Sequence, residues 1–259
     1  MLPVKSPRGA AVSSCGLFLA ETFMHHLGQT RSAHHADHIL QTPETFVRAP
    51  LPGMRKATAI VHTSPAIGAQ FTQYTAEFEP GGSLEPAAEQ RFLYVLEGEV
   101  EINGVVLPHG DYAYLPPGHP ARVSSQTAAL AAIIEKPYLP LPGVSVPDCF
   151  TGRESARPAT ALMGDEALEV RALLPEDAAF DFAVNTMTYH PGATLPKVEI
   201  HVMEHGLLML AGGGIYRLGD QWYPVKKGDF IWMAPFCPQW FGALGKTSAK
   251  YLIYKDWNR

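Results

Sequence analysis

The chain has 259 residues, of which 46% are hydrophobic, so it is long enough for one large or two small domains and is not predominantly disordered. The formal net charge is -5 and no basic run is present to neutralise phosphates, which argues against a nucleic-acid partner. The cysteines Cys15, Cys149 and Cys237 form no CxxC pair, so we expect neither a disulfide scaffold nor a thiolate zinc site. No apolar stretch approaches the length of a membrane span, so we expect a cytoplasmic protein without a membrane partner.

The first predicted element is an extension of residues 1–49, in which residues 10–27 show brief helical periodicity. The extension holds a group of histidines at irregular spacing: His25, His26, His34, His35 and His38. Irregular spacing in a terminal segment is not typical of a metal site, so we predict a mobile surface segment here.

The following region is predicted to form short antiparallel strands, punctuated by glycine and proline, of which the chain has 23 each. Residues 92–102 combine an apolar, β-prone run with an alternating segment, and the Asn-Gly dipeptide at 103–104 is typical of a type I′ hairpin turn. Residues 207–218 repeat this arrangement and end in a Gly-Asp turn at 219–220. We therefore predict a mostly antiparallel β-structure in two copies.

Constant offsets between the halves indicate an internal duplication. Glu85 precedes Glu199 by 114 positions, and Lys136 precedes Lys255 by 119. The predicted domains are the extension of residues 1–49, a first repeat of residues 50–145, and a second repeat of residues 158–259, with a proline-rich connector at 137–147.

Ionisable side chains that suit a metal ion gather in residues 191–205. If this segment is a strand, alternation places Glu199, His201 and His205 on one face. Two imidazoles and one carboxylate can bind one side of a divalent cation and leave coordination positions open, as catalysis requires. The alternative is that these residues merely lie along an exposed strand face.

The spacing in this segment resembles the first of two motifs of the cupins, which are double-stranded β-helix barrels. The motif positions are occupied by Gly192, Glu199, His201, His205 and Gly212, with glutamate and one histidine exchanged relative to the usual order. In the second motif, which begins at Gly228, Gln239 stands at the position of the fourth ligand, and the usual proline and second glycine are out of register. The resemblance implies an all-β bicupin of two double-stranded β-helix (jelly-roll) barrels in tandem, with a metal bound by Glu199, His201, His205 and Gln239.

The corresponding ligand positions of the first repeat are Glu85, Ala87, Arg91 and Ala121. Because alanine offers no donor atom, we predict a first barrel without metal ligands that serves as a scaffold or as an oligomerisation partner. We expect the protein to form a homo-oligomer.

The ligand set, together with the C-terminal segment 251–259, resembles the (S)-ureidoglycine aminohydrolase family of manganese enzymes of purine and allantoin breakdown. The resemblance covers residues 50–259 and implies release of ammonia from (S)-ureidoglycine to give (S)-ureidoglycolate. It places the substrate-contacting tyrosine and lysine on Tyr251 and Lys255. On a strand these two share one face, and a buried lysine near a metal would have a lowered pKa. The alternatives are an exposed lysine and a core tyrosine.

The predicted mechanism has Mn²⁺ orienting a small-molecule substrate, with Tyr251, Glu199 and Gln239 among its contacts. Lys255 would assist either water activation or protonation of the leaving amine. Fe, Co and Ni also accept this donor set, so the donors alone do not select manganese. Two other functions remain open: another metal-dependent cupin enzyme, such as an iron dioxygenase or an isomerase, and a non-catalytic bicupin that binds a small ligand.

Overall fold

The computed structural model describes residues 28–256, and within this range the chain is built almost entirely from strands, as predicted. The chain divides into a unit of residues 1–30, of which 28–30 are described, and a compact unit of residues 31–259. The segment with helical periodicity, together with His25 and His26, lies outside the described residues. The helices of the described part are three short 3₁₀ turns: η1 (Pro43–Thr45), η2 (Pro65–Ile67) and η3 (Glu154–Ala156). No helix in this part is long and apolar enough to cross a membrane.

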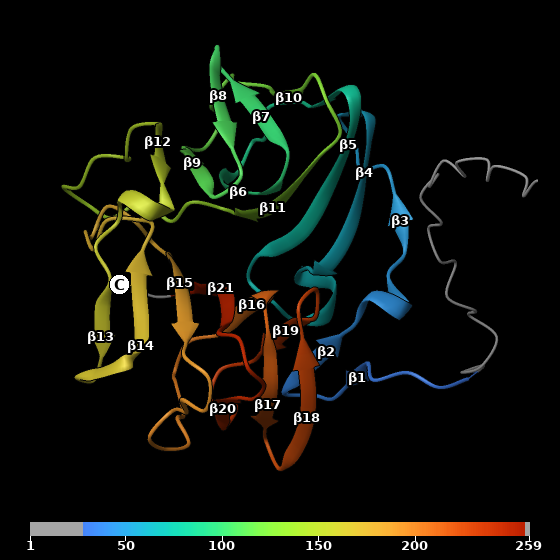
Figure 1. Cartoon of the computed structure of the whole chain (residues 1–259). Helices are drawn as coiled ribbons and strands as arrows, with labels where there is room; N and C mark the ends of the chain where they lie inside the picture. The colour runs from blue at the N-terminus through green and yellow to red at the C-terminus, as the bar shows by residue number, and fades with distance from the viewer. Residues whose placement is uncertain (1–27, 257–259) are drawn as a thin grey trace, which may run out of the picture. The chain divides into compact units, whose positions relative to one another are not determined.

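The first barrel is a curled sheet in which β5 pairs with β4, β10 and β11 (Figure 1). Its strands are β3 (Arg48–Ala49), β4 (Met54–Thr63), β5 (Thr72–Leu84), β6 (Gln90–Glu97), β7 (Glu99–Ile102), β8 (Val105–Pro108), β9 (Asp111–Leu115), β10 (Val123–Ser125), β11 (Ala129–Lys136) and β12 (Phe150–Arg153). The predicted hairpin turn is confirmed, because Asn103 and Gly104 join β7 to β8 with φ angles of 51° and 78°.

The second barrel consists of a larger sheet in the order β1-β2-β19-β16-β21-β15-β14-β13 and a smaller one in the order β18-β17-β20. The strands of the larger sheet are β1 (Ala33–His34), β2 (His38–Gln41), β13 (Thr160–Leu162), β14 (Asp165–Ala172), β15 (Ala183–Tyr189), β16 (His205–Ala211), β19 (Phe230–Met233) and β21 (Ala249–Lys255). Those of the smaller sheet are β17 (Gly213–Leu218), β18 (Gln221–Lys226) and β20 (Gln239–Ala243).

The segment just before residue 50 contributes strands to the second barrel. In Figure 1 the blue strand β2 lies beside the orange β19, and the two strands pair in register, with Ile39 opposite Trp232. Arg31 holds the start of the segment through bidentate bonds of 2.6 and 2.8 Å to Asp229. The prediction of a mobile surface segment is therefore wrong for His38, whose side chain is buried in β2. A four-residue strand is too short for its alternation to stand out in the sequence.

Alternating side chains of the central strands fill two different layers. In β21, Tyr251 and Ile253 belong to the core of the second barrel, whereas Leu252 and Tyr254 pack between the barrels. Strands β6, β9 and β11 of the first barrel divide their side chains in the same way. Burial on both faces explains why these strands are nearly continuous apolar runs rather than alternating ones.

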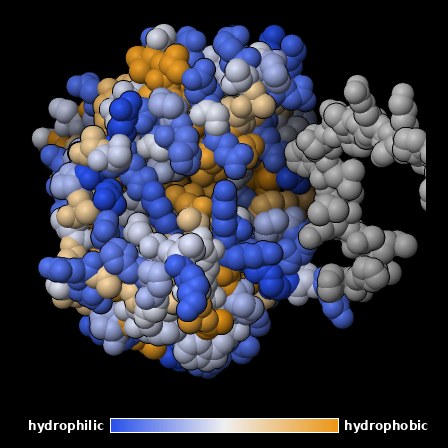
Figure 2. Space-filling model, in the orientation of Figure 1, coloured by the Kyte–Doolittle hydropathy of each residue, from blue (hydrophilic) through white to orange (hydrophobic). Residues whose placement is uncertain are grey.

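A groove of about 480 Å³ remains between the two barrels, lined by side chains from both, including Tyr94, Leu130 and Leu208. Figure 2 shows a hollow with apolar residues near the middle of the viewed face. Charged groups stand at the same groove, among them Lys250, which forms a 2.6 Å ion pair with the buried carboxylate of Glu154.

The strand register corrects the pairing of Lys136 with Lys255. In the first barrel Glu135 lies opposite Arg91, and in the second Lys255 lies opposite His205, so the structural counterpart of Lys255 is Glu135. Lys136 faces the layer between the barrels, where it binds Asp181 at 3.1 Å. An alignment shifted by one residue exchanges the two faces of a strand, which is why the matching lysines of the sequence were misleading.

A buried histidine in this fold predicts an acid-sensitive stability. His62 is fully enclosed, bonds Gln41 and Thr75 at 2.7 and 2.9 Å, and burial lowers its pKa to about 3. Between the ordinary pKa of 6.5 and this value, the unfolded chain binds a proton that the folded chain does not, so stability falls as pH falls. We expect His62 to cost about 2 kcal/mol of unfolding free energy between pH 6.5 and 5.

Denaturant unfolding of chelator-treated protein across this pH range, compared with His62→Gln, checks the expectation. As pH falls, the unfolding free energy of the variant should decrease less steeply than that of the parent. The difference between the two slopes should be about 1.4 kcal/mol per pH unit. Other titrating groups contribute equally to both proteins and cancel in the difference. Parallel curves would show that His62 is not buried in its neutral form.

Candidate metal centre

The second barrel encloses a cavity of about 410 Å³ to which the larger sheet, the smaller sheet and the loop before β16 contribute. All six residues predicted from the sequence line this cavity: Glu199, His201, His205, Gln239, Tyr251 and Lys255. Residues of different elements, far apart in the sequence, are thus brought to one concave, largely enclosed place, which is typical of a small-molecule site.

The segment before β16 is a loop and not the strand that the sequence predicts. Its pairing with β20 is limited to two isolated bridges, Thr194 with Gly242 and Glu199 with Gln239. From one bridge to the other, the six residues 194–199 oppose the four residues 239–242, so a continuous ladder cannot form. Pro196 lies in the longer segment and offers no backbone donor. The strand begins only at His205. The loop nevertheless brings the predicted donors together.

Backbone contacts fix the two ends of the donor set against each other. Glu199 N–H donates to Gln239 O at 2.8 Å, and Gln239 N–H donates to Glu199 O at 2.9 Å. Nearby, Phe236 N–H donates to His201 O at 2.7 Å. Phe236 has a φ of 65°, close to the 68° of Gly118 in the first barrel, so it adopts the left-handed turn of the motif without glycine. This conformation costs a non-glycine residue about 1–2 kcal/mol.

Neighbouring members of the donor set lie close together at the cavity. His201 Nε2 lies 3.1 Å from Glu199 Oε2, and the rings of His201 and His205 are 5.1 Å apart between centroids. Gln239 is buried, and its Oε1 accepts a 3.2 Å hydrogen bond from the hydroxyl of Tyr216. The second barrel therefore gathers two imidazoles, a carboxylate and an amide oxygen.

His205 has the character of a metal ligand. Burial, followed by the charges of Lys255 and His201, lowers its pKa to about 3, so its imidazole is neutral at neutral pH. Among the described residues, none hydrogen-bonds its buried Nδ1. Neutral imidazole is the form that binds metals, and mixed nitrogen and oxygen donors suit a divalent transition ion. The residues present fit such an ion.

The cavity wall on β21 carries the lysine and the tyrosine. Lys255 lies opposite His205 in the sheet, and burial lowers its pKa, while the carboxylates of Glu199 and Glu176 oppose this shift. With the amide of Asn185 oriented to satisfy both of its groups, the amide oxygen accepts from Lys255 Nζ at 3.2 Å. The alternative of an exposed lysine is thus wrong. Tyr251 is buried at the cavity and shares a 2.8 Å hydroxyl contact with Tyr189.

The first barrel has an ion pair at the equivalent place. Arg91, the counterpart of His205, is buried and donates from Nε to Glu135 at 2.7 Å. The hydroxyl of Tyr74 donates to the same carboxylate at 3.0 Å. A guanidinium thus supplies the positive charge that the carboxylate of this barrel requires.

Three further residues of the cavity wall are not predicted from the sequence. Met187, Leu195 and Tyr216 line the cavity but belong to strands or loops with no polar motif. The signal that could have identified Met187 is alternation along β15, where it faces the barrel core.

Comparison with known proteins places both halves in one superfamily. The family model described as "Cupin domain" matches residues 185–254, and the model described as "EutQ-like cupin domain" matches residues 66–138. The chain is 41% identical over 239 residues to "(S)-ureidoglycine aminohydrolase" of Arabidopsis thaliana, covering 90% of this chain and 80% of the relative. It is 30% identical to the Escherichia coli (strain K12) protein of the same name, covering 87% and 90%.

The chain belongs to the (S)-ureidoglycine aminohydrolase family. A crystal structure of the E. coli protein Ylba superposes with a TM-score of 0.79 at 28% identity, covering 90% of this chain and 96% of the other. The predicted bicupin fold is therefore confirmed. The match of residues 185–254 to the cupin model contains all four donors, Glu199, His201, His205 and Gln239.

Proposed function

We propose that this chain is a manganese-dependent hydrolase that releases ammonia from (S)-ureidoglycine to give (S)-ureidoglycolate in purine catabolism. The observation that carries the proposal is the single cavity lined by four metal donors and the partly buried Lys255. The names of its relatives support the same reaction. The similarity to these relatives extends over both barrels. The complete donor set lies in the second barrel.

The proposed ligands of Mn²⁺ are Glu199, His201, His205 and Gln239. When bound, the ion would act as a Lewis acid that holds and polarises the substrate, with coordination positions left for it. Glu199 supplies the single carboxylate of the set, and Gln239 is held by Tyr216 so that its amide oxygen is oriented. Carboxylate, amide and imidazole donors suit manganese, with iron, cobalt and nickel as alternatives.

Lys255 is proposed to move a proton. Hydrolysis breaks the bond between the substrate's Cα and its amine, forms a bond from Cα to a water oxygen, and requires one proton on the departing nitrogen. A lysine whose pKa is lowered by burial is a stronger acid than a free one and can donate that proton. The water that attacks loses a proton, which returns the lysine to its charged form.

Tyr251 is proposed to fix the substrate. Burial raises the pKa of Tyr251, so its hydroxyl remains neutral. When Tyr189 donates the hydrogen of their 2.8 Å contact, the hydroxyl hydrogen of Tyr251 is left unused. That hydrogen can bind the ureido or carboxylate oxygen of a substrate. Glu199 and Gln239 line the same cavity and would share in substrate contacts. The apolar wall of Met187, Leu195 and Ile253 limits bulk water and favours one pose of a small polar molecule.

The direct test is ammonia release from (S)-ureidoglycine, generated in place from allantoate, with manganese-loaded and chelator-treated protein compared. We expect release above the spontaneous rate only in the loaded protein, with (S)-ureidoglycolate as the chiral product. Absence of release from metal-loaded protein would contradict the proposal. Oxygen uptake with candidate substrates would then point to an iron dioxygenase, and ligand binding without turnover to a non-catalytic bicupin.

A further inference from the structure

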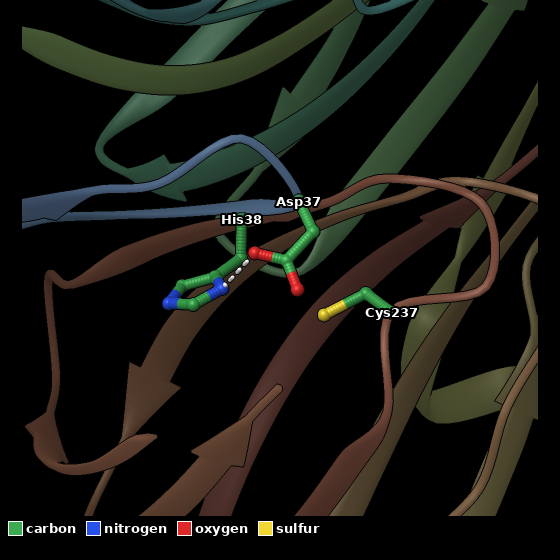
Figure 3. Close-up of side chains that lie close together, drawn as sticks. All are labelled: Asp37, His38 and Cys237. Carbon is green, nitrogen blue, oxygen red and sulfur yellow. Dashed lines mark hydrogen bonds and ion pairs between the residues drawn. The ribbon is translucent and has the colours of Figure 1, made fainter. Parts of the chain in front are cut away.

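A second group of metal-binding side chains lies outside the cavity described above. Asp37 and His38 stand where the turn between β1 and β2 enters β2, and Cys237 lies in the turn before β20 (Figure 3). One donor atom from each lies within 4.8 Å of the other two. His38 and Cys237 are buried, whereas the side chain of Asp37 is 47% exposed.

The three side chains converge on one place, where Asp37 and His38 already contact each other. His38 Nδ1 is 2.8 Å from one oxygen of Asp37, and Figure 3 shows the other oxygen of Asp37 directed towards the sulfur of Cys237. The second nitrogen of His38, Nε2, lies 2.9 Å from the hydroxyl of Tyr223. Metal-binding histidines commonly use one ring nitrogen for the metal and donate the other N–H to such a partner, which fixes the ring.

We propose that Asp37, His38 and Cys237 bind a zinc-like divalent cation at a second site, separate from the catalytic cavity. Donors around a tetrahedral zinc ion lie roughly 3.3–3.8 Å apart, given bonds of about 2.0–2.3 Å. Side-chain rotations that shorten the widest separation by at most about 1 Å, and that exchange the 2.8 Å contact between Asp37 and His38 Nδ1 for bonds to the ion, would therefore complete the site. The exposed side of Asp37 leaves the fourth position accessible to water.

The donor chemistry separates this site from the catalytic one. Thiolate sulfur is a soft ligand that favours zinc, whereas Glu199 and Gln239 offer hard oxygens that suit manganese. On binding, the thiol of Cys237 loses its proton to solvent, and the thiolate and the carboxylate of Asp37 together balance the two positive charges. His38 binds as neutral imidazole. No redox change is involved.

The location gives the cation a structural role. Asp37 O already accepts a 2.9 Å bond from Ala234 N–H, at the start of the turn that contains Cys237. Two residues after Cys237 comes Gln239, the proposed manganese ligand. Close packing against Gly219, where a side chain would meet Asp37 at 3.0 Å, shows that the turn fits tightly here. A cation bound to all three residues would hold the β1–β2 turn against the turn that positions Gln239.

Cobalt absorption tests the site without reference to activity, because a cobalt–thiolate bond gives a near-ultraviolet charge-transfer band that the catalytic donor set cannot produce. The full-length double variant Cys15→Ser/Cys149→Ser leaves Cys237 as the only cysteine. We expect this protein, stripped of metal and titrated with Co²⁺, to develop the band with saturation at one thiolate-bound ion per chain. Zinc should then displace it.

Single substitutions in that background identify the ligands. Asp37→Asn and His38→Gln should raise the Co²⁺ concentration that gives the half-maximal band at least tenfold. Cys237→Ser should abolish the band. His34→Gln, which removes an exposed histidine on β1, should leave it unchanged. Absence of the band in the double variant, or its persistence after Cys237→Ser, would overturn the proposal. Because Asp37→Asn alters a half-exposed side chain, it keeps the test valid if a core variant fails to fold. Manganese-dependent ammonia release plays no part in these readouts, so the proposed function can fail independently.

Discussion

Replacing His205 with alanine is expected to abolish tight manganese binding and, with it, ammonia release. His205 is the more deeply buried of the two histidine donors. Its imidazole is neutral, and no described residue hydrogen-bonds its Nδ1. Loss of groups that only support a metal ligand already costs about 10–100-fold in affinity, so loss of a ligand itself should cost at least about 100-fold. Calorimetric titration of stripped protein with Mn²⁺ measures this change directly.

The matched control is His190→Ala. His190 follows β15 in the same barrel, but its side chain is half exposed and does not line the cavity. The control should bind manganese and release ammonia like the parent. His201→Ala should behave like His205→Ala if both imidazoles bind the ion. Unchanged manganese affinity in His205→Ala would remove this residue from the ligand set.

The architecture was predictable because its signals are local. An Asn-Gly pair between alternating runs determines the β7–β8 hairpin, since both turn residues require positive φ. Repeated glycines and constant offsets indicated the duplication. The spacing of Glu199, His201 and His205 identified candidate donors, and the structure brings them to one cavity together with Gln239, although the strand assumed for them is a loop.

The rest depended on long-range pairing, which sequence patterns do not contain. The match of Lys136 with Lys255 failed because the insertions that separate the repeats shift the register by one residue, and one residue reverses the face. The burial of His38 depends on the pairing of β2 with β19, nearly two hundred residues away. The left-handed turn at Phe236 was hidden because the expected glycine is absent.

Replacing Lys255 with methionine is expected to lower turnover about 10²–10⁴-fold, the usual contribution of a positioned acid or base. Methionine keeps the length and apolar stem of the side chain and removes only the amine, so manganese affinity should stay close to that of the parent.

The pH profile separates proton transfer from mere positioning. If the charged amine acts as the acid, the parent's kcat falls as pH rises through a pKa that burial places below the ordinary 10.5. The Lys255→Met profile should lack that alkaline limb. Lys250→Met is the matched control, because Lys250 lies on the same strand but faces Glu154, away from the cavity. The Lys250→Met protein should be less stable than the parent, and its folded molecules should have the parent's kcat. Full turnover in manganese-loaded Lys255→Met would instead mean that the leaving amine takes its proton from water. The role of Lys255 would then be limited to the effect of its positive charge on the donor set.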